Sequence, residues 1–198
     1  MNAQSPKRPV AAALPGFEHI ERVWDAHHNI WLARIHPGDT GVTTSAEGVT
    51  TVLGSFVSAC VRDTRTGVGG MNHFILLDER QGIDAMDSLV NAVLAHGCGE
   101  RARLELKLVG GCQLKPGTQE ISQRTLAFAR QFAASAKLTV AAEDVGGVLG
   151  REVVYWPGTG QLRIRKLRGI QALLAKSERE YGASLQAAHT GDTGGRVG

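Results

Sequence analysis

The sequence predicts a single-domain α+β fold with a layered α/β/β sandwich arrangement. Hairpin-like pairs of strand segments alternate with two or three helical segments, without the strict strand–helix–strand order of a doubly wound parallel sheet. The 198 residues suffice for one domain with a sizeable core, and 42% hydrophobic with 21% charged residues is typical of a globular protein. We therefore expect one domain over about 17–180, between a disordered tail at 1–16 and a flexible tail at 181–198.

Composition and motifs exclude several classes of function. The net charge of +3 is small and no recognition motif gathers the basic residues, so we expect no nucleic-acid partner. The three cysteines cannot all pair and match no zinc-binding pattern, which indicates reduced thiols. The apolar run at 10–14 is too short for a signal peptide, and no segment approaches the length of a membrane span. These observations predict a cytoplasmic protein that does not insert into a membrane.

Apolar runs and turn residues predict the strands of the first half. The segment 30–36 is strand-like and ends at a Pro-Gly-Asp turn at 37–39. A second strand-like run begins at Val49. Segments 57–62 and 68–74 are joined by DTRTG, whose polar residues and glycine are typical of hairpin turns.

Helical spacing predicts most of the second half. Apolar residues recur at helical intervals over 84–96, where we expect Asp84 to cap the helix and Gly97 to end it. A second helix, at 120–136, has an apolar stripe that includes Ile121, Phe128 and Phe132. The other expected elements are strands at 104–109 and 137–142, a hairpin of 151–156 with 161–167, and a final helix at 169–186.

The most informative stretch covers residues 49–74. It holds Thr50, then Leu53, Gly54 and Ser55, and it ends in the run GGMNHF. In order and spacing these residues resemble the signature of the CheD family, the chemoreceptor glutamine deamidases of bacterial chemotaxis. The resemblance extends over about 30–168, through the turns at 37–39, 110–112 and 143–147 and the hairpin after them.

The resemblance implies a fold, a reaction and partners. It implies a layered sandwich that needs no cofactor or metal. It also implies that the protein deamidates glutamines on the cytoplasmic helices of chemoreceptors, and that it binds CheC-type phosphatases or other chemotaxis proteins. The family's catalytic cysteine follows Ser55, its imidazole corresponds to His73, and its supporting threonine corresponds to Thr50. This chain has Phe56 at the position of the cysteine.

Deamidation depends on the missing nucleophile. A thiolate attacks the carboxamide carbon, ammonia leaves, and water hydrolyses the thioester, while an imidazole moves the protons. Phe56 provides neither a nucleophile nor a proton. Cys60 shares a strand face with Phe56 but lies about 13 Å along it, far beyond the roughly 3 Å that a nucleophile and its base require. We interpret Cys60, Cys98 and Cys112 as small apolar residues of the fold.

Two hypotheses follow from the resemblance and from Phe56. In the first, the chain is a glutamine deamidase whose nucleophile is yet to be identified. In the second, it is a non-catalytic CheD-like protein, a pseudoenzyme that binds receptor helices or a chemotaxis partner. Loss of a nucleophile lowers turnover by about 10⁶ in a well-studied hydrolase, and that magnitude favours the second hypothesis.

Several other patterns carry weaker hypotheses. His27 and His28 are adjacent, yet further ligands at zinc spacing are missing, so we expect no metal. The glycines at 67–70 lack the third glycine and the helix of a dinucleotide-binding loop. The carboxylates of Glu143 and Asp144 should point apart on an extended chain. The basic end of the last hairpin is either a solvated strand face or a docking surface for an acidic partner, through Arg163, Arg165, Lys166 and Arg168.

Overall fold

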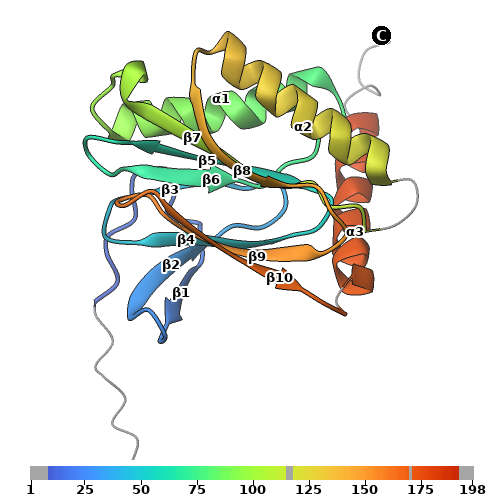
Figure 1. Cartoon of the computed structure of the whole chain (residues 1–198), viewed down its shortest axis with the longest axis horizontal. Coiled ribbons are helices and arrows are strands. Elements are labelled where there is room, and N and C mark those ends of the chain that lie inside the picture. The colour runs from blue at the N-terminus through green and yellow to red at the C-terminus, as the bar shows by residue number, and fades with distance from the viewer. Residues whose placement is uncertain (1–8, 115–117, 170, 192–198) are drawn as a thin grey trace, which may run out of the picture.

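Two five-stranded sheets dominate the computed structural model, which describes residues 9–114, 118–169 and 171–191 (Figure 1). Sheet A holds, in spatial order, β1 (Arg22–Asp25), β2 (Ile30–Arg34), β4 (Gly48–Leu53), β9 (Gly150–Trp156) and β10 (Gln161–Leu167). Sheet B holds β3 (Thr40–Thr43), β6 (Gly69–Asn72), β5 (Val57–Asp63), β7 (Leu104–Gly110) and β8 (Thr139–Val145). The helices are α1 (Glu79–His96), α2 (Thr118–Ser135) and α3 (Gln171–Gly191), with a 3-10 turn at Arg101–Arg103.

Both sheets are mixed. In sheet A, β2 and β4 run parallel and the other neighbours run antiparallel. In sheet B, β7 and β8 form the parallel pair. The central pair of sheet B, β5 and β7, is antiparallel from Val57 opposite Gly110 to Asp63 opposite Leu104.

The layers are helices, sheet B and sheet A, in that order. Figure 1 shows α1 and α2 over one face of sheet B, with sheet A against its other face and α3 standing at one end of the two sheets. Side chains of β5 point alternately toward the helices and toward sheet A, because successive strand side chains point to opposite faces. Val57, Ala59 and Val61 pack toward the helices, whereas Cys60 belongs to the core between the sheets. The predicted α+β fold with an α/β/β sandwich is therefore confirmed.

Several element boundaries differ from the sequence prediction. Helix α1 begins at Glu79, because the Asp78 carboxylate accepts the backbone N–H of Gln81 at 2.8 Å and caps the helix there. The expected cap, Asp84, lies inside α1, whereas Gly97 ends the helix as predicted. The strands β1 and β3 were not predicted, because four residues are too few to show a clear alternation.

The buried face of α2 is rotated toward Ala129 and Ala133, which were expected beside the apolar stripe, while Phe128 and Phe132 of the stripe are partly buried. Its buried residues are small or polar as often as they are apolar: Ser122, Thr125, Leu126, Ala129 and Ala133. Phe128 and Phe132 are partly buried at the side of this face, with ring centroids 6.5 Å apart. Large aromatic rings do not fit where α2 lies close to sheet B, so small residues form the contact.

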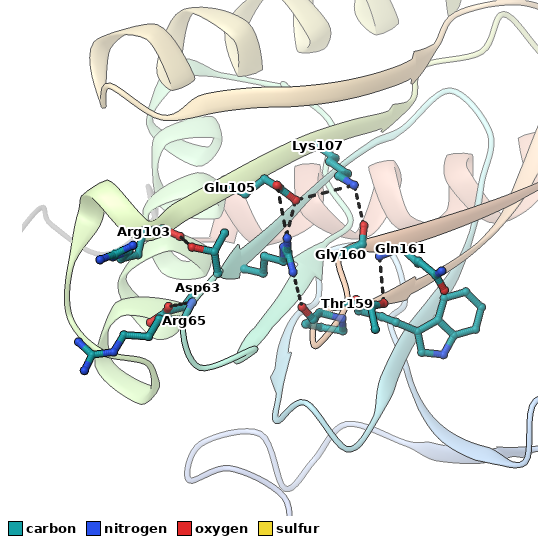
Figure 2. Close-up of polar contacts among 12 residues, drawn as sticks. Asp63, Arg65, Arg103, Glu105, Lys107, Thr159, Gly160 and Gln161 are labelled. Carbon is teal, nitrogen blue, oxygen red and sulfur yellow. Dashed lines mark hydrogen bonds and ion pairs between the residues drawn. The ribbon is translucent and has the colours of Figure 1, made fainter.

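At the end of the sandwich opposite α3, a polar network connects the two sheets. Figure 2 shows Glu105 and Lys107 of β7 beside the turn that joins β9 and β10. The Lys107 ammonium donates to the carbonyl of Gly160 at 2.6 Å, and the Arg62 guanidinium contacts Glu105 at 3.0 Å. A further bond runs from Arg62 to the carbonyl of Pro157 at 3.5 Å. Sheet B thereby holds the turn of sheet A through charged side chains.

The structure describes part of each predicted tail. Residues 9–16 contain no helix or strand, and 1–8 lie outside the described residues. The last helix runs to Gly191, past 181, where the flexible tail was expected to begin, and 192–198 also lie outside the described residues. None of the helices in the described ranges is long and apolar enough to cross a membrane.

Candidate functional site

The start of β5 and the end of β6 bring Phe56 and His73 together. Val57 and Phe74 exchange both backbone hydrogen bonds at 2.9 Å, and their side chains point toward the helices. Their neighbours Phe56 and His73 therefore point into the layer between the sheets. The rings of Phe56 and His73 meet edge to face with centroids 5.3 Å apart, and their exposed fractions are 1% and 2%. The imidazole predicted from the sequence thus lies against the residue that stands in the nucleophile position.

Thr51, and not Thr50, contacts the imidazole. The Thr51 hydroxyl lies 2.9 Å from Nδ1 of His73 and donates to the carbonyl of Ile35 at 2.8 Å. The expected residue, Thr50, points to the other face of β4 and donates to the carbonyl of Val153 at 2.9 Å. The reason is strand alternation, which places adjacent side chains on opposite faces.

The threonine fixes the tautomer of His73. The carbonyl of Ile35 can only accept, so the single hydroxyl proton of Thr51 is committed to it. Nδ1 of His73 must then carry a proton and donate it to the Thr51 oxygen. Nε2 is left with a lone pair, and it is buried without a hydrogen-bond partner among the residues that the structure describes. A general base needs this protonation state, with a free lone pair. The neighbouring phenyl ring of Phe56 has no acidic proton for it to accept.

Burial keeps the imidazole neutral. Desolvation, with a smaller contribution from the nearby His36, lowers the pKa of His73 to about 3. At neutral pH the ring is therefore an acceptor at Nε2 and a donor at Nδ1.

A carboxylate of α3 binds the backbone N–H groups at the start of β5. Glu178 accepts from the N–H of Ser55 at 2.7 Å, from the N–H of Phe56 at 3.4 Å, and from the Ser55 hydroxyl. Burial raises the pKa of Glu178 above its ordinary value, although these hydrogen bonds act in the opposite direction. One turn further along α3, the Tyr181 ring meets Phe56 with centroids 5.8 Å apart. We call the N–H groups of Ser55 and Phe56, with the Ser55 hydroxyl, the amide cradle.

A hollow of about 240 Å³ opens beside His73. It lies between β4, the end of β2 and α3, and Thr50, Thr51, His73 and Glu178 all line it. Phe56 is not among the lining residues, because its ring is buried against Tyr181. Two of the predicted site residues, Thr50 and His73, thus line one depression, while Phe56, at the position predicted for the nucleophile, is buried against α3.

None of the three cysteines takes the place of the nucleophile. Burial raises the pKa of Cys60 to about 12 and that of Cys112 to about 11, so both are protonated and poorly reactive. Cys60 packs in the same core as Phe56, as its strand position predicted. Cys98 lies beyond the end of α1, where its N–H donates to Asp63 at 2.6 Å. Within the described part of the chain, Nε2 of His73 bonds to no sulfur atom.

Several other side chains singled out in the sequence are engaged in structural contacts. Nδ1 of His28 lies 2.5 Å from Asp25, and its Nε2 contacts Arg163. Glu143 and Asp144 turn to different partners, Arg130 at 2.6 Å and Arg151 at 2.8 Å. At the basic end of the last hairpin, the ion pairs are those of Arg165 with Glu152 and of Lys166 with Asp144.

Sequence reasoning missed three residues of the site. Thr51 had a usable signal, since Val49, Thr51 and Leu53 alternate on the apolar face of β4. Glu178 and Tyr181 had none, because they lie more than 100 positions after Ser55 and Phe56 and belong to an ordinary amphipathic helix.

Comparison with known proteins matches this chain to one family. A family model described as CheD chemotactic sensory transduction matches residues 77–166. A protein of Halorhodospira halophila, named probable chemoreceptor glutamine deamidase CheD, is 42% identical over 174 residues, which cover 80% of each chain. A protein of Saccharophagus degradans with the same name is 38% identical over 193 residues, 87% of this chain and 88% of its own. A third so named, from Hahella chejuensis, is 34% identical over 85% of this chain and 86% of its own.

Proposed function

This chain belongs to the CheD family, and from that premise we propose that it binds the cytoplasmic helices of chemoreceptors without deamidating them. Its place of action is the cytoplasm, where those helices lie. In this proposal it is a chemotaxis protein that keeps the family's binding surface and has lost the family's nucleophile.

The observation that carries the proposal is the burial of Phe56. Its ring is 1% exposed and packs between His73 and Tyr181, so the position of the attacking atom is filled by hydrocarbon. Nε2 of His73 has a lone pair and, within the described residues, no hydrogen-bond partner. A base without a nucleophile beside it forms no acyl intermediate with a carboxamide.

The amide cradle supports the binding part of the proposal. Two N–H groups and a hydroxyl converge on one carboxylate of a helix, Glu178. Donors arranged in this way also suit the carbonyl oxygen of a glutamine side chain. The hollow beside His73 leaves room for part of a partner next to that position.

Deamidation remains the second candidate, because the same geometry supplies a base and oxygen-binding donors. Without a thiol, water would have to attack the carboxamide directly, with its proton passing to Nε2 of His73. The buried imidazole has a pKa of about 3, which makes it a weak base for that step.

One experiment separates the two candidates. The purified chain is titrated with the cytoplasmic fragment of a chemoreceptor, and the fragment is then analysed by peptide mass spectrometry for conversion of glutamine to glutamate. We expect saturable binding and no conversion above a protein-free control. Conversion by the unaltered chain that disappears in His73→Ala would contradict the non-catalytic proposal and establish the enzyme.

A further inference from the structure

We propose that α3 is a built-in competitor for this site: Glu178 occupies the amide cradle as a glutamine side chain of a partner helix would, so a partner must displace α3 to bind. The inference rests on the proposed function for the identity of the partner, a receptor helix, but the occupancy by α3 is independent of it. On this inference, the partner contributes a helix whose glutamine or glutamate side chain takes the place of Glu178 in the amide cradle.

The first observation is chemical. A glutamate carboxylate has the shape of a glutamine carboxamide, and it is the product of glutamine deamidation. In this structure one Glu178 oxygen accepts the N–H groups of Ser55 and Phe56, and the other accepts the Ser55 hydroxyl. A carboxamide oxygen can accept the same two N–H bonds, and its NH₂ group can donate to the hydroxyl oxygen.

The second observation is steric. Leu174, Glu178 and Tyr181 lie on one face of α3, at the i, i+4 and i+7 spacing of a helix. Each of the three lies against a glycine: Leu174 against Gly150, Glu178 against Gly54, and Tyr181 against Gly38.

At each of these glycines, a side chain would require the facing residue of α3 to move. A Cβ atom at Gly150 would stand 2.5 Å from the Leu174 side chain, and one at Gly54 or Gly38 would overlap Glu178 or Tyr181. Three glycines from separate loops and strands thus form one seat for a helix. The seat and the amide cradle together make a helix-binding surface, with one polar position between two apolar ones.

The opposite face of α3 shows no such fit. Lys176, Arg179 and Glu180 are exposed. Among the described residues, Glu180 forms an ion pair only with Lys176, one turn earlier, at 3.8 Å. Glu178 and Glu180 therefore carry the same charge on one helix, one in the cradle and one in solvent. They form a matched pair for experiment.

Intermolecular complementation tests the occupancy without a receptor. The probe is a fluorescein-labelled peptide with the sequence of residues 171–191, titrated into the full-length chain and followed by fluorescence polarisation. Glu178→Lys removes the internal competitor, so we expect this variant to bind the peptide at least about tenfold more tightly than the unaltered chain. Glu180→Lys makes the same charge change on the exposed face and should bind as the unaltered chain does.

The peptide itself is varied to test the chemistry of the cradle. A peptide with glutamine in place of the glutamate at 178 should retain binding to the Glu178→Lys protein, whereas a lysine there should abolish it. Equal affinity of the unaltered chain and Glu178→Lys for the parent peptide, or no binding to either, overturns the proposal. Circular dichroism confirms that the variants fold, and Glu178→Ala replaces Glu178→Lys if the latter does not.

Hydrogen exchange gives a second, direct measurement. The N–H groups of Ser55 and Phe56 should exchange faster in Glu178→Lys than in the unaltered chain, with Glu180→Lys unchanged. Exchange at these two amides that is equally fast in all three proteins overturns the proposal.

A receptor arm separates failure of the inference from failure of the proposed function. The Glu178→Lys protein should bind the chemoreceptor cytoplasmic fragment at least about tenfold more tightly than the unaltered chain. Peptide binding without receptor binding upholds the occupancy by α3 and refutes the receptor as partner. Receptor binding that is the same with and without Glu178 overturns the competition by α3 and leaves the proposed function standing.

Discussion

Restoring a thiol at position 56 tests whether the rest of the reaction machinery is intact. Phe56→Cys removes a fully buried ring and its edge-to-face contacts with His73 and Tyr181. Truncation of buried phenylalanine to alanine costs about 3–5 kcal/mol. Cysteine keeps one heavy atom more than alanine, so we expect a loss of about 2–4 kcal/mol. With a urea m-value of about 2 kcal/mol per molar, the midpoint of unfolding should fall by about 1–2 M.

The position of Glu178 allows the restored enzyme to be assayed on itself. In the double variant Phe56→Cys with Glu178→Gln, the new thiol lies beside a carboxamide held in the amide cradle. The thiolate should attack that carboxamide and release ammonia, and water should hydrolyse the thioester to leave glutamate at 178. Intact-mass and peptide mass spectrometry follow the conversion over time.

Two controls isolate the thiol and the base. Phe56→Ala with Glu178→Gln opens the same space without a nucleophile and should not convert. Adding His73→Ala to the converting variant should slow it by about 10²–10⁴-fold. If the double variant folds, shows no conversion, and its new thiol reacts with iodoacetamide no faster than Cys98 of the parent, the reasoning from His73 and the cradle is refuted.

Three further predictions use urea unfolding. The pKa of His73 is about 3 in the folded protein, while an unfolded histidine titrates near 6.5. The free energy of unfolding should therefore fall by up to about 1.4 kcal/mol per pH unit as the pH decreases from about 6.5 toward 3. His73→Asn should remove this pH dependence, and an unchanged dependence would contradict the burial argument. Thr51→Val should cost about 1–3 kcal/mol by leaving Nδ1 of His73 unpaired, and Thr50→Val only about 0.5–1.5; equal costs would contradict the assignment of Thr51. Lys107→Met should lower the free energy of unfolding by about 1–2 kcal/mol through the lost hydrogen bond to Gly160. Binding of the 171–191 peptide should be unaltered, and a change in that binding would show that the two ends of the sandwich are coupled.

The fold was predictable where apolar residues recur in the sequence at the spacing of a strand or a helix. The alternation at 104–109 marks β7, and the hairpin of 151–156 with 161–167 matches β9 and β10 within one residue. The start of α1 was misplaced because an internal aspartate, Asp84, looked like a cap as good as Asp78. A cap is decided by which carboxylate reaches a free N–H, and that depends on where the preceding chain enters the helix.

The site was predictable in part. The pairing of position 56 with His73 follows from the hairpin of β5 and β6, and the resemblance to the family identified both positions. Thr51, and not Thr50, contacts His73, because a strand's faces alternate, which a motif match alone does not take into account. The role of α3 depends on contacts between Glu178 and Ser55 that are 123 positions apart, and no local pattern reports such a distance.

The strand order of sheet A leads us to expect a particular order of events in folding. The hydrogen bond from Thr50 to Val153 joins residues 103 positions apart, so β4 waits for β9 with one edge unpaired. Long-range pairing of this kind is slow, and domains dominated by it fold in about milliseconds to seconds. The hairpin that brings Phe56 to His73 closes over a short loop and can assemble early. We therefore expect the contact of Phe56 with His73 to form in a nascent sheet B, and α3 to close over it after sheet A is complete.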